Sequence, residues 1–405
     1  MVKGIVDKVV FGGKGIVRSE GLVIFVDDVL PNEEIEFEIT QKKKNFSIAK
    51  LVNCITTGPD RVNARCPHFG SCGGCQLQHI RYEKQLELKR EWLFDTLKRV
   101  GGVDVEVPIT VHAAEHPYGY RNKIILHAKE GKIGFVSRSH ELFDVQCCPI
   151  FIDQETDLFA LLHKANIVDA TISVFKEPKA IHIKYEGMLP NDSKMVYELF
   201  SGQGYKVQIE ARDQSIGDEL AFEIVVEDVI CSFSPKVFIQ NAPRQFSRVY
   251  KTVLDSIKAI GYSGPILDLY CGVGILSLLL AKRGHKVTGI ELNDKAVGYA
   301  KGALQRNGIT SARFFSTASE SCMRYKDKES WGVWIVNPPR TGLSDRMKQE
   351  ILQAKPKYLY YISCDPATLA RDLAKLCQIY RIESVDLFDM FSQTTHFETV
   401  VCLKF

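Results

Sequence analysis

A group of three cysteines and one separate cysteine in this chain have the spacing and neighbours expected of chemically active thiols. The first group is Cys66-x5-Cys72-x2-Cys75, in a run whose glycines let the loop bend. The second is a single thiol, Cys364, within the segment SCDP at 363–366. The 405-residue chain has 12 cysteines, too few for a disulfide scaffold. Grouped cysteines in a reducing compartment are typical of metal ligands or catalytic thiols.

The first group predicts a site for a metal ion or a cluster. Its three thiols lie within ten residues, and Cys147 or Cys148 could supply a fourth. Four thiolates bind either zinc or an iron–sulfur cluster, and the spacing does not separate the two. Paired C-x2-C motifs would favour zinc, but here only one such pair is present.

The second group predicts nucleophilic chemistry. Cys364 follows a predicted strand over 358–363, and the Asp-Pro pair after it makes a sharp exit that projects the thiol from the sheet edge. His396 and Glu398 are two residues apart, so a strand would place both on one face. A thiol and a carboxylate can act as nucleophile and general base. Four other cysteines are predicted to pack in the core: Cys231, Cys322, Cys377 and Cys402.

A glycine turn predicts a nucleotide-type cofactor site. The segment DLYCGVG at 268–274 follows a predicted strand, and Glu291 ends the next strand. The glycines let a ligand approach the backbone, and an acid about twenty residues later can accept hydrogen bonds from ribose hydroxyls. Ser277 stands where a dinucleotide site would have its third glycine. The pattern therefore favours a ligand without a pyrophosphate.

Strand and helix patterns divide the chain into three predicted parts. Residues 1–60 have the short alternating strands of a small OB-like β-barrel. Residues 61–235 are predicted to form a mixed α+β central domain with the cysteine cluster. Residues 236–405 alternate strands with helices, which indicates a Rossmann-like, doubly wound parallel sheet. The predicted fold class is multidomain α/β.

Charge and hydropathy exclude several classes of protein. Lys and Arg total 52 against 49 for Asp and Glu, a net charge of +3, so any nucleic-acid affinity must come from local surfaces. The N-terminus lacks the apolar run of a signal peptide. The most apolar window, 266–281, is too short and too polar for a membrane span. We therefore expect a cytoplasmic protein with no membrane partner.

Five segments together resemble the RNA uracil-C5 methyltransferase family, which uses S-adenosylmethionine. They are Phe238-x-Gln240, DLYCG at 268–272, NPPR at 337–340, SCDP at 363–366 and HFE at 396–398. The resemblance extends over the whole chain. It implies that Cys364 is the nucleophile and Glu398 the proton acceptor. It also implies four cofactor-binding residues: Gln240, Tyr270, Glu291 and Asn337.

Two positions depart from the pattern of that family. The family usually has aspartate where Asn337 stands, so one negative charge is lost while a hydrogen-bonding oxygen is kept. The family also tends to have asparagine two residues after the glutamine. Here Asn241 follows Gln240 directly, and Ala242 occupies the usual place. The first departure implies altered contacts to the cofactor or to the base, and the second concerns the cofactor contact of Gln240.

Within the family, the chain resembles the branch that acts on 23S ribosomal RNA. The spacing of the first cysteine group is similar to the [4Fe–4S] site of that branch. Its last ligand precedes Pro-Ile, which implies Cys148 rather than Cys147 here. The predicted barrel resembles the branch's TRAM domain, and segment 118–123 resembles its Y-R-N-K segment. Such aromatic and basic residues suit single-stranded RNA.

The resemblance implies methylation of uracil C5 in structured RNA through a thiol adduct at C6. 23S ribosomal RNA is the first expected substrate and transfer RNA the second, with no protein partner implied. Zinc is the alternative to the iron–sulfur cluster. A cytosine-C5 methyltransferase and a non-catalytic RNA-binding protein are the alternative functions. The presence of both Cys364 and Glu398 argues against the non-catalytic one.

Overall fold

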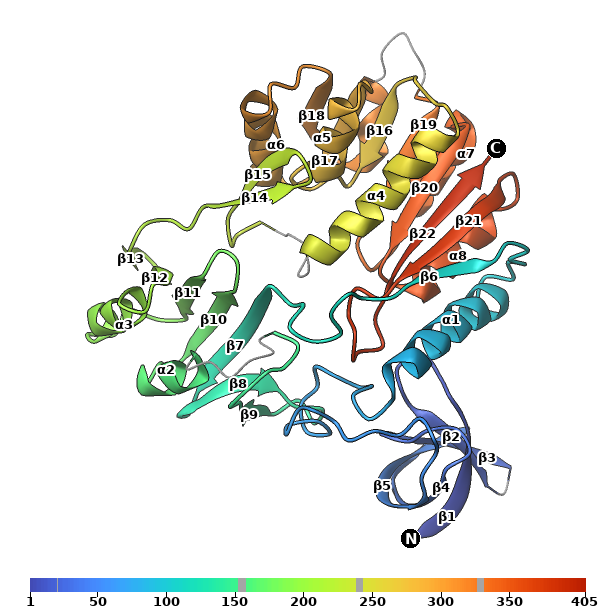
Figure 1. The fold of residues 1–405 in the computed structure, drawn as a ribbon, viewed down its shortest axis with the longest axis vertical. Helices are drawn as coiled ribbons and strands as arrows, with labels where there is room; N and C mark the ends of the chain where they lie inside the picture. The colour runs from blue at the N-terminus through green and yellow to red at the C-terminus, as the bar shows by residue number, and fades with distance from the viewer. Residues whose placement is uncertain (20, 152–157, 238–242, 326–330) are drawn as a thin grey trace.

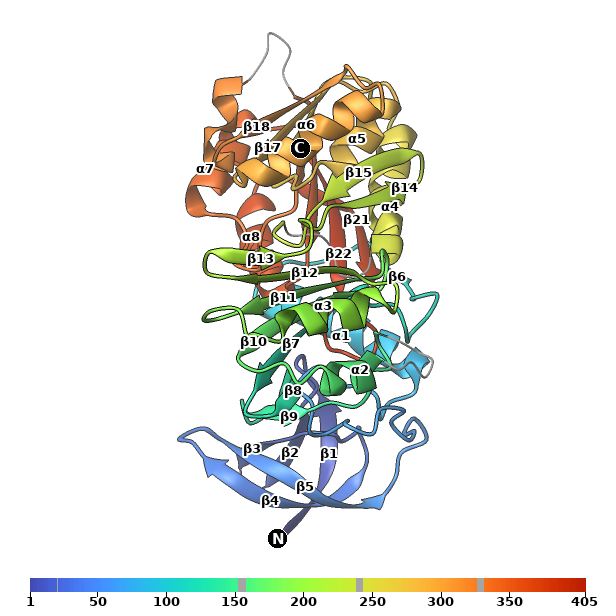
Figure 2. The same cartoon turned by 90° about the vertical axis from the view of Figure 1, so that its left-hand side faces the viewer.

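The structure is a computed structural model that describes residues 1–405 except 20, 152–157, 238–242 and 326–330. A barrel, a central sheet and a larger layered sheet follow one another along its long axis (Figures 1 and 2). The predicted multidomain α/β fold is confirmed. In the part of the chain that the structure describes, no helix is long and apolar enough to cross a membrane.

The N-terminal part is a closed five-stranded barrel with the order β1-β2-β3-β5-β4. Its strands are β1 (Val2–Val9), β2 (Gly15–Ser19), β3 (Leu22–Val26), β4 (Glu34–Lys42) and β5 (Phe46–Thr56). In β4, Ile35 and Phe37 point into the barrel core, as the period-two pattern of this segment predicts. The Trp92 indole N–H donates a 2.8 Å hydrogen bond to the Val9 carbonyl, which attaches the barrel to the next helix.

The central part is a seven-stranded sheet with the order β13-β12-β11-β10-β7-β8-β9. Its strands are β7 (Lys123–Lys129), β8 (Lys132–Val136), β9 (Leu142–Asp144), β10 (Ala170–Phe175), β11 (Ala180–Tyr185), β12 (Lys206–Ala211) and β13 (Gln214–Ile216). Helices α2 (Leu158–Lys164) and α3 (Ser193–Ser201) contribute to its core. Cys75 and Cys148 belong to the same core, so the cysteine loop packs against this sheet.

The C-terminal part is an eight-stranded sheet with the order β18-β17-β16-β19-β20-β22-β21-β6. Its strands are β6 (Ile109–His112), β16 (Ile266–Leu269), β17 (Val287–Glu291), β18 (Ala312–Ser316), β19 (Val333–Val336), β20 (Tyr358–Ser363), β21 (Arg381–Phe388) and β22 (Glu398–Lys404). The strands from β18 to β20 are parallel, and β22 runs antiparallel to both of its neighbours.

Helices cover both faces of this sheet. One face carries α4 (Pro243–Ala259), α5 (Ile275–Lys282) and α6 (Asp294–Arg306), and the other carries α1 (Tyr82–Arg99), α7 (Asp345–Ala354) and α8 (Pro366–Leu376). Neighbouring strand residues alternate between the two cores, as Ile266 and Leu267 do. The 3-10 helix η1 (Ser319–Tyr325) follows β18, and the hairpin of β14 (Phe222–Val226) and β15 (Val229–Phe233) packs against α4, α5 and α6.

Two elements from the N-terminal half join the C-terminal sheet. β6 pairs in parallel with β21, and α1 packs against α8. Both elements fall in the range 61–235 that the sequence predicts as the central domain, and the boundaries at 60 and 235 stay predictions. The helix that follows the cysteine loop therefore covers the sheet that carries Cys364 and Glu398 (Figure 1).

Candidate active site

The candidate site lies at the edge of the C-terminal sheet where its parallel strands end. β16, β17, β19 and β20 run in the same direction, so their carboxyl ends meet at one edge, where open α/β sheets bind ligands. Four of the predicted site residues end or directly follow these strands: Tyr270, Glu291, Asn337 and Cys364. The structure thus brings them to one edge of the sheet.

The antiparallel strand β22 brings a carboxylate to the same edge. Because β22 runs opposite to β20, it begins where β20 ends, and the register pairs Ser363 with Thr399. Glu398, the first residue of β22, therefore lies beside Cys364. The two side chains interact electrostatically, since the Glu398 carboxylate adds to the rise in the pKa of Cys364 that burial causes.

The turn after β20 holds Cys364 in place. Asp365 caps α8, where its Oδ1 accepts hydrogen bonds of 2.9 Å from the amides of Ala367 and Thr368. The Ser363 hydroxyl donates to the Asp365 carbonyl at 3.0 Å and accepts from the Asp365 amide at 3.2 Å. Cys364 is half-buried between the strand and the helix. The SCDP segment therefore forms the predicted sharp exit.

Glu398 and Arg340 set the electrostatics around the thiol. Glu398 is only 3% exposed, and burial raises its pKa to about 8 against the opposing charge of Arg340. The Arg340 guanidinium also lowers the pKa of Cys364, against burial and the Glu398 charge. A carboxyl group with a pKa near 8 can exchange a proton around neutral pH, which suits an acid–base group.

His396 lies in the loop before β22 instead of on the strand. The strand begins at Glu398, so the predicted common strand face for these two residues is wrong. His396 is half-buried, and its pKa is lowered by burial and by the positive charges of Arg340 and Lys89. Its carbonyl oxygen accepts a hydrogen bond of 3.0 Å from Lys89 Nζ. This loop is held through its backbone rather than through a strand pairing.

The glycine turn after β16 leaves open space beside a carboxylate. A Cβ at Gly274, where φ is +79°, would lie 2.7 Å from Phe314, whereas one at Gly272 would meet no atom within 4 Å. Glu291 accepts backbone N–H bonds from Gly272 at 3.1 Å and from Asn293 at 2.8 Å, one on each oxygen. Each oxygen keeps a lone pair for a ligand hydroxyl. The turn therefore fits a ribose-bearing cofactor.

Two further residues support the turn. Asp268 is buried and accepts a 2.6 Å hydrogen bond from Ser277 Oγ, and burial raises its pKa to about 7. Ser277, which stands in place of a third glycine, therefore stabilises the turn through its hydrogen bond to Asp268. The backbone N–H of Asn337 donates a 3.3 Å hydrogen bond to the Leu269 carbonyl. This bond connects the ends of β19 and β16. Gln240, the fourth predicted cofactor contact, lies outside the described residues.

The predicted cysteine site surrounds a cavity of about 300 Å³. Five cysteines line it: Cys66, Cys72, Cys75, Cys147 and Cys148. The first cysteine group is thus brought together with both candidates for a fourth ligand. Among the residues that the structure describes, no three Cys, His, Asp or Glu side chains form a group that could hold one metal ion. The thiols therefore line the cavity without forming a site for a single ion.

Burial disfavours the thiolates in this pocket. It raises the pKa of Cys75 to about 11 and that of Cys148 to about 12, and the neighbouring thiols add to both shifts. Arg121 lines the same cavity and opposes them with its positive charge. Thiolates here would gain most from the positive charge of a bound metal centre.

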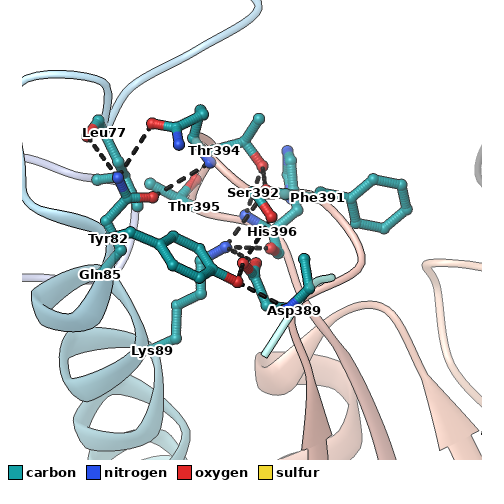
Figure 3. Close-up of polar contacts among 12 residues, drawn as sticks. Leu77, Tyr82, Gln85, Lys89, Asp389, Phe391, Ser392, Thr394, Thr395 and His396 are labelled. Carbon is teal, nitrogen blue, oxygen red and sulfur yellow. Dashed lines mark hydrogen bonds and ion pairs between the residues drawn. The ribbon is translucent and has the colours of Figure 1, made fainter. Parts of the chain in front are cut away.

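Sequence reasoning missed a buried polar cluster on α1 (Figure 3). Tyr82, Gln85 and Lys89 point from this helix toward the loop between β21 and β22. Lys89 Nζ lies 2.5 Å from Asp389 Oδ1, and both side chains are fully buried. The three α1 residues share one helix face, which is the local signal that could have revealed them. Their partner is 300 residues away in sequence.

The segment 118–123, predicted to contact RNA, is partly engaged within the fold. The Tyr120 hydroxyl donates to the Ser392 carbonyl at 3.0 Å. The Asn122 side chain donates to the Glu177 carbonyl at 2.8 Å and accepts from the Glu177 amide at 2.9 Å. RNA binding by this segment stays a prediction.

Comparisons with known proteins bear on the whole chain. The family model described as tRNA (Uracil-5-)-methyltransferase matches residues 199–405. An uncharacterized RNA methyltransferase of Protochlamydia amoebophila is 36% identical over 427 residues, which cover 100% of this chain and 97% of that protein. An uncharacterized RNA methyltransferase of Clostridium acetobutylicum is 31% identical and covers 97% of this chain and 94% of its own.

A solved structure matches the entire architecture. It is the crystal structure of Pyrococcus abyssi tRNA (uracil-54, C5)-methyltransferase in complex with S-adenosyl-L-homocysteine. Its TM-score with this chain is 0.77 at 26% sequence identity, and the match covers 99% of this chain and 100% of the other. The barrel, the central sheet and the layered sheet all fall within the matched length.

Proposed function

The chain belongs to the RNA uracil-C5 methyltransferase family, and from this premise we propose that it methylates a uridine of 23S ribosomal RNA with Cys364 as nucleophile and Glu398 as proton acceptor. It is an S-adenosylmethionine-dependent RNA (uracil-5-)-methyltransferase. The observation that carries the proposed residue roles is the register of β22, which begins at Glu398 beside the end of β20.

The reaction must make C5 of uracil nucleophilic. Bound S-adenosylmethionine supplies an electrophilic methyl group. The Cys364 thiolate adds to C6, and the electron pair of the C5=C6 bond moves to the C4 carbonyl oxygen. That pair returns to form a bond from C5 to the methyl carbon, whose bond to sulfur breaks, so that neutral S-adenosylhomocysteine leaves. Glu398 then accepts the C5 proton, the C5=C6 bond forms again, and the Cys364 thiolate leaves.

The electrostatics of the two residues support this division of roles. Glu398 is buried with a pKa of about 8, so its carboxylate is a stronger base than an exposed one and can take the C5 proton. Burial and the Glu398 charge raise the pKa of Cys364, and the Arg340 guanidinium opposes that rise and so favours the thiolate. The active form has both groups deprotonated, and Glu398 releases the C5 proton to solvent before the next turnover.

The cofactor-binding roles rest on the turn after β16. We propose that Glu291 accepts hydrogen bonds from the ribose hydroxyls, because each of its oxygens keeps a free lone pair. We propose Tyr270 and Asn337 as further cofactor contacts, because they directly follow the neighbouring strands β16 and β19 at the same sheet edge. Gln240 is proposed as a fourth contact from the family pattern alone.

We propose that the cysteine pocket holds a [4Fe–4S] cluster on Cys66, Cys72, Cys75 and Cys148. Cys148 is preferred over Cys147 because Pro-Ile follows it, as in the family pattern, and because its buried thiol interacts electrostatically with Cys75 as well as with Cys66. The cluster would have a structural or RNA-positioning role, because the methyl transfer involves no electron transfer. Anaerobic purification with iron and sulfide assays tests this proposal. Stoichiometric zinc without sulfide would refute it.

The target uridine must leave its base stack to reach Cys364. Extrusion costs a few kcal/mol, and less in a loop or bulge, so an unpaired uridine in a structured RNA is the expected target. Transfer RNA is the second candidate substrate. It is favoured by the Pyrococcus abyssi relative, which acts on tRNA and whose match includes the barrel. The barrel therefore does not separate the two RNA classes.

One experiment tests both the base and the RNA class. Nucleotide-resolution mapping of 5-methyluridine is compared between a wild-type strain and a strain that lacks this protein. Loss of a 5-methyluridine from 23S ribosomal RNA supports the proposal, and loss from transfer RNA supports the second candidate. Loss of 5-methylcytidine instead would show that the enzyme acts on cytosine.

A further inference from the structure

The loop that leads into Glu398 is held by a helix from the other end of the chain. This loop, residues 389–397, joins β21 to β22. Figure 3 shows three side chains of α1 pointing at it, with Lys89 in the middle. α1 starts shortly after Cys75, so the same segment of chain links the cysteine pocket to the candidate site.

Lys89 is fully buried, and all three of its N–H donors have acceptors in the loop. They point at Asp389 Oδ1 at 2.5 Å, the Phe391 carbonyl at 3.2 Å and the His396 carbonyl at 3.0 Å. An ammonium group has three donors and no acceptor, so none is left over. The His396 carbonyl belongs to a residue two positions before Glu398. Lys89 therefore fixes the backbone immediately ahead of the proposed proton acceptor.

The Asp389 carboxylate is equally well satisfied. Its second oxygen accepts hydrogen bonds of 2.7 Å from the Tyr82 hydroxyl and of 2.7 Å from Ser392 Oγ. The Tyr82 hydroxyl in turn accepts the Ala114 amide at 2.7 Å. Asp389 thus joins α1, the segment after β6 and the loop itself. The Asp389 carboxylate therefore does two things. It holds the start of the loop, and it supplies the negative charge that compensates the buried Lys89 ammonium group.

A second set of bonds joins the loop to the cysteine segment. Gln85 and Gln393 exchange two hydrogen bonds, one of 3.0 Å between the side chains and one of 3.1 Å from the Gln393 amide. The Gln393 carbonyl accepts the amides of Gln76 and Leu77 at 3.1 and 3.0 Å. Gln76 directly follows Cys75. The loop before Glu398 is therefore bonded to the residues that border the cysteine pocket.

The ion pair is not explained by stability alone. Desolvating two charges is expensive, and replacing a buried ion pair with apolar residues is often neutral or stabilising. Directional hydrogen bonds from one ammonium group fix the position of each acceptor. Here the acceptors are Asp389 at the start of the loop and the His396 carbonyl near its end. The geometry therefore favours a positioning role.

We propose that Lys89 and Asp389 form a positioning pair that sets Glu398 at the distance from C5 that proton removal requires. The proposal rests on the proposed function, because it takes Glu398 as the proton acceptor. Catalytic geometry is sensitive, since a displacement of about 1 Å can slow a reaction roughly 100-fold. A loosened loop should slow proton removal from C5 and leave the addition of Cys364 to C6 unaffected. The covalent enzyme–RNA adduct would then accumulate.

The test compares adduct formation with adduct resolution in Lys89→Met/Asp389→Asn, which removes both charges together and leaves neither one buried alone. RNA carrying a C5 tritium label is mixed with the full-length enzyme and S-adenosylmethionine in a single turnover. Denaturing gels measure the adduct, and tritium release measures proton removal. We expect adduct formation within about threefold of wild type and tritium release slowed roughly 100-fold. Glu398→Gln should show the same pattern in stronger form.

A matched control separates positioning from general destabilisation. Arg61 forms a comparable ion pair with Glu33, whose carboxylate is fully buried beside the barrel. Glu33 also accepts backbone hydrogen bonds. Arg61→Met/Glu33→Gln should lower the unfolding midpoint without adduct accumulation. Tyr82→Phe removes one donor from Asp389 and should give a smaller accumulation, so the proposal remains testable if the double variant does not fold.

Three outcomes would overturn the proposal. In the first, the folded double variant Lys89→Met/Asp389→Asn releases tritium at the wild-type rate and accumulates no adduct. If that variant does not fold, the same result in Tyr82→Phe counts instead. In the second, the Arg61/Glu33 control accumulates adduct to the same extent. In the third, Glu398→Gln forms an adduct and resolves it normally, which would refute the proposed role of Glu398 itself. Only the third outcome concerns the proposed function, so the two failures are distinguishable.

Discussion

The molecule has thiols in two regions that differ in the groups that surround them. In the cysteine pocket, five thiols face one another around a cavity, with Arg121 as a cation on its wall. At the sheet edge, Cys364 lies beside one carboxylate, with Arg340 as the nearby cation. Burial raises thiol pKa values in both regions. The regions differ in what can compensate for a negative charge.

The difference indicates what each region can do. Ionising Cys75 or Cys148 in the pocket costs roughly 3 to 4 kcal/mol relative to an exposed thiol, from pKa values of about 11 and 12. Several such thiolates together require a bound cationic centre, which suits ligands. At the sheet edge only one thiol must ionise, and a base stands beside it. That arrangement suits a nucleophile which forms and breaks a bond in each cycle.

The largest expected effect separates the two regions by activity. Cys364→Ala removes the nucleophile, so we expect methyl transfer to fall by roughly four orders of magnitude or more. RNA containing 5-fluorouridine should form a covalent adduct with the wild-type enzyme and none with this variant, because fluorine cannot leave as a proton does. Cys377→Ala, another half-buried thiol on the same domain, is the control and should keep its activity. Wild-type activity in Cys364→Ala would refute the mechanism.

The next effect concerns the pocket. Cys75→Ser replaces a proposed ligand, so iron and sulfide content should fall in the anaerobically purified protein. We expect a loss of about 3 kcal/mol in stability, which lowers Tm by roughly 6 to 12 °C in a domain of this size. Calorimetry and metal analysis check both. Cys54→Ser, a half-buried thiol in the barrel, should change neither. Unchanged metal content in Cys75→Ser would remove this cysteine from the ligand set.

The third effect is a pH dependence at the sheet edge. Glu398 accepts a proton only when deprotonated, and its pKa is about 8. Resolution of the adduct should therefore rise tenfold per pH unit below about pH 8 and level off above it. Rapid-quench measurements of tritium release from C5 between about pH 6 and pH 9.5, on both sides of this pKa, test the expectation. A flat profile would contradict the role of Glu398 as the base.

Part of this comparison could be predicted from sequence. Local patterns indicate the strand over 358–363, and the structure has it with the same bounds. Spacing also indicates the first cysteine group, because its members are close in the chain. The face shared by His396 and Glu398 was predicted wrongly, since two residues of separation carry no information about where the strand begins.

The rest depends on contacts that have no local signal. Lys89 and Asp389 are 300 residues apart, and a lysine in an amphipathic helix ordinarily predicts a solvated face. The contacts of Lys89 with the loop from 389 to 397 lie in a buried site that the local pattern does not indicate. The pairing of β6 with β21 is a similar case, because a four-residue strand carries too few residues to specify its neighbour.

The smallest expected effects come from removing the cation of each region. Arg340→Met should raise the pKa of both Cys364 and Glu398, because this guanidinium lowers each of them. The resolution profile should shift to higher pH, and the rate of Cys364 alkylation by iodoacetamide at pH 8 should fall severalfold, because less of the thiol is ionised. Arg121→Met should instead slow alkylation of Cys75 and Cys148 in the metal-free protein. Peptide mass spectrometry reads all three thiols in one sample, so each variant serves as the control for the other. If Arg121→Met altered Cys364 as strongly as Arg340→Met did, the two thiol regions would not be electrostatically separate, and the comparison drawn above would fail.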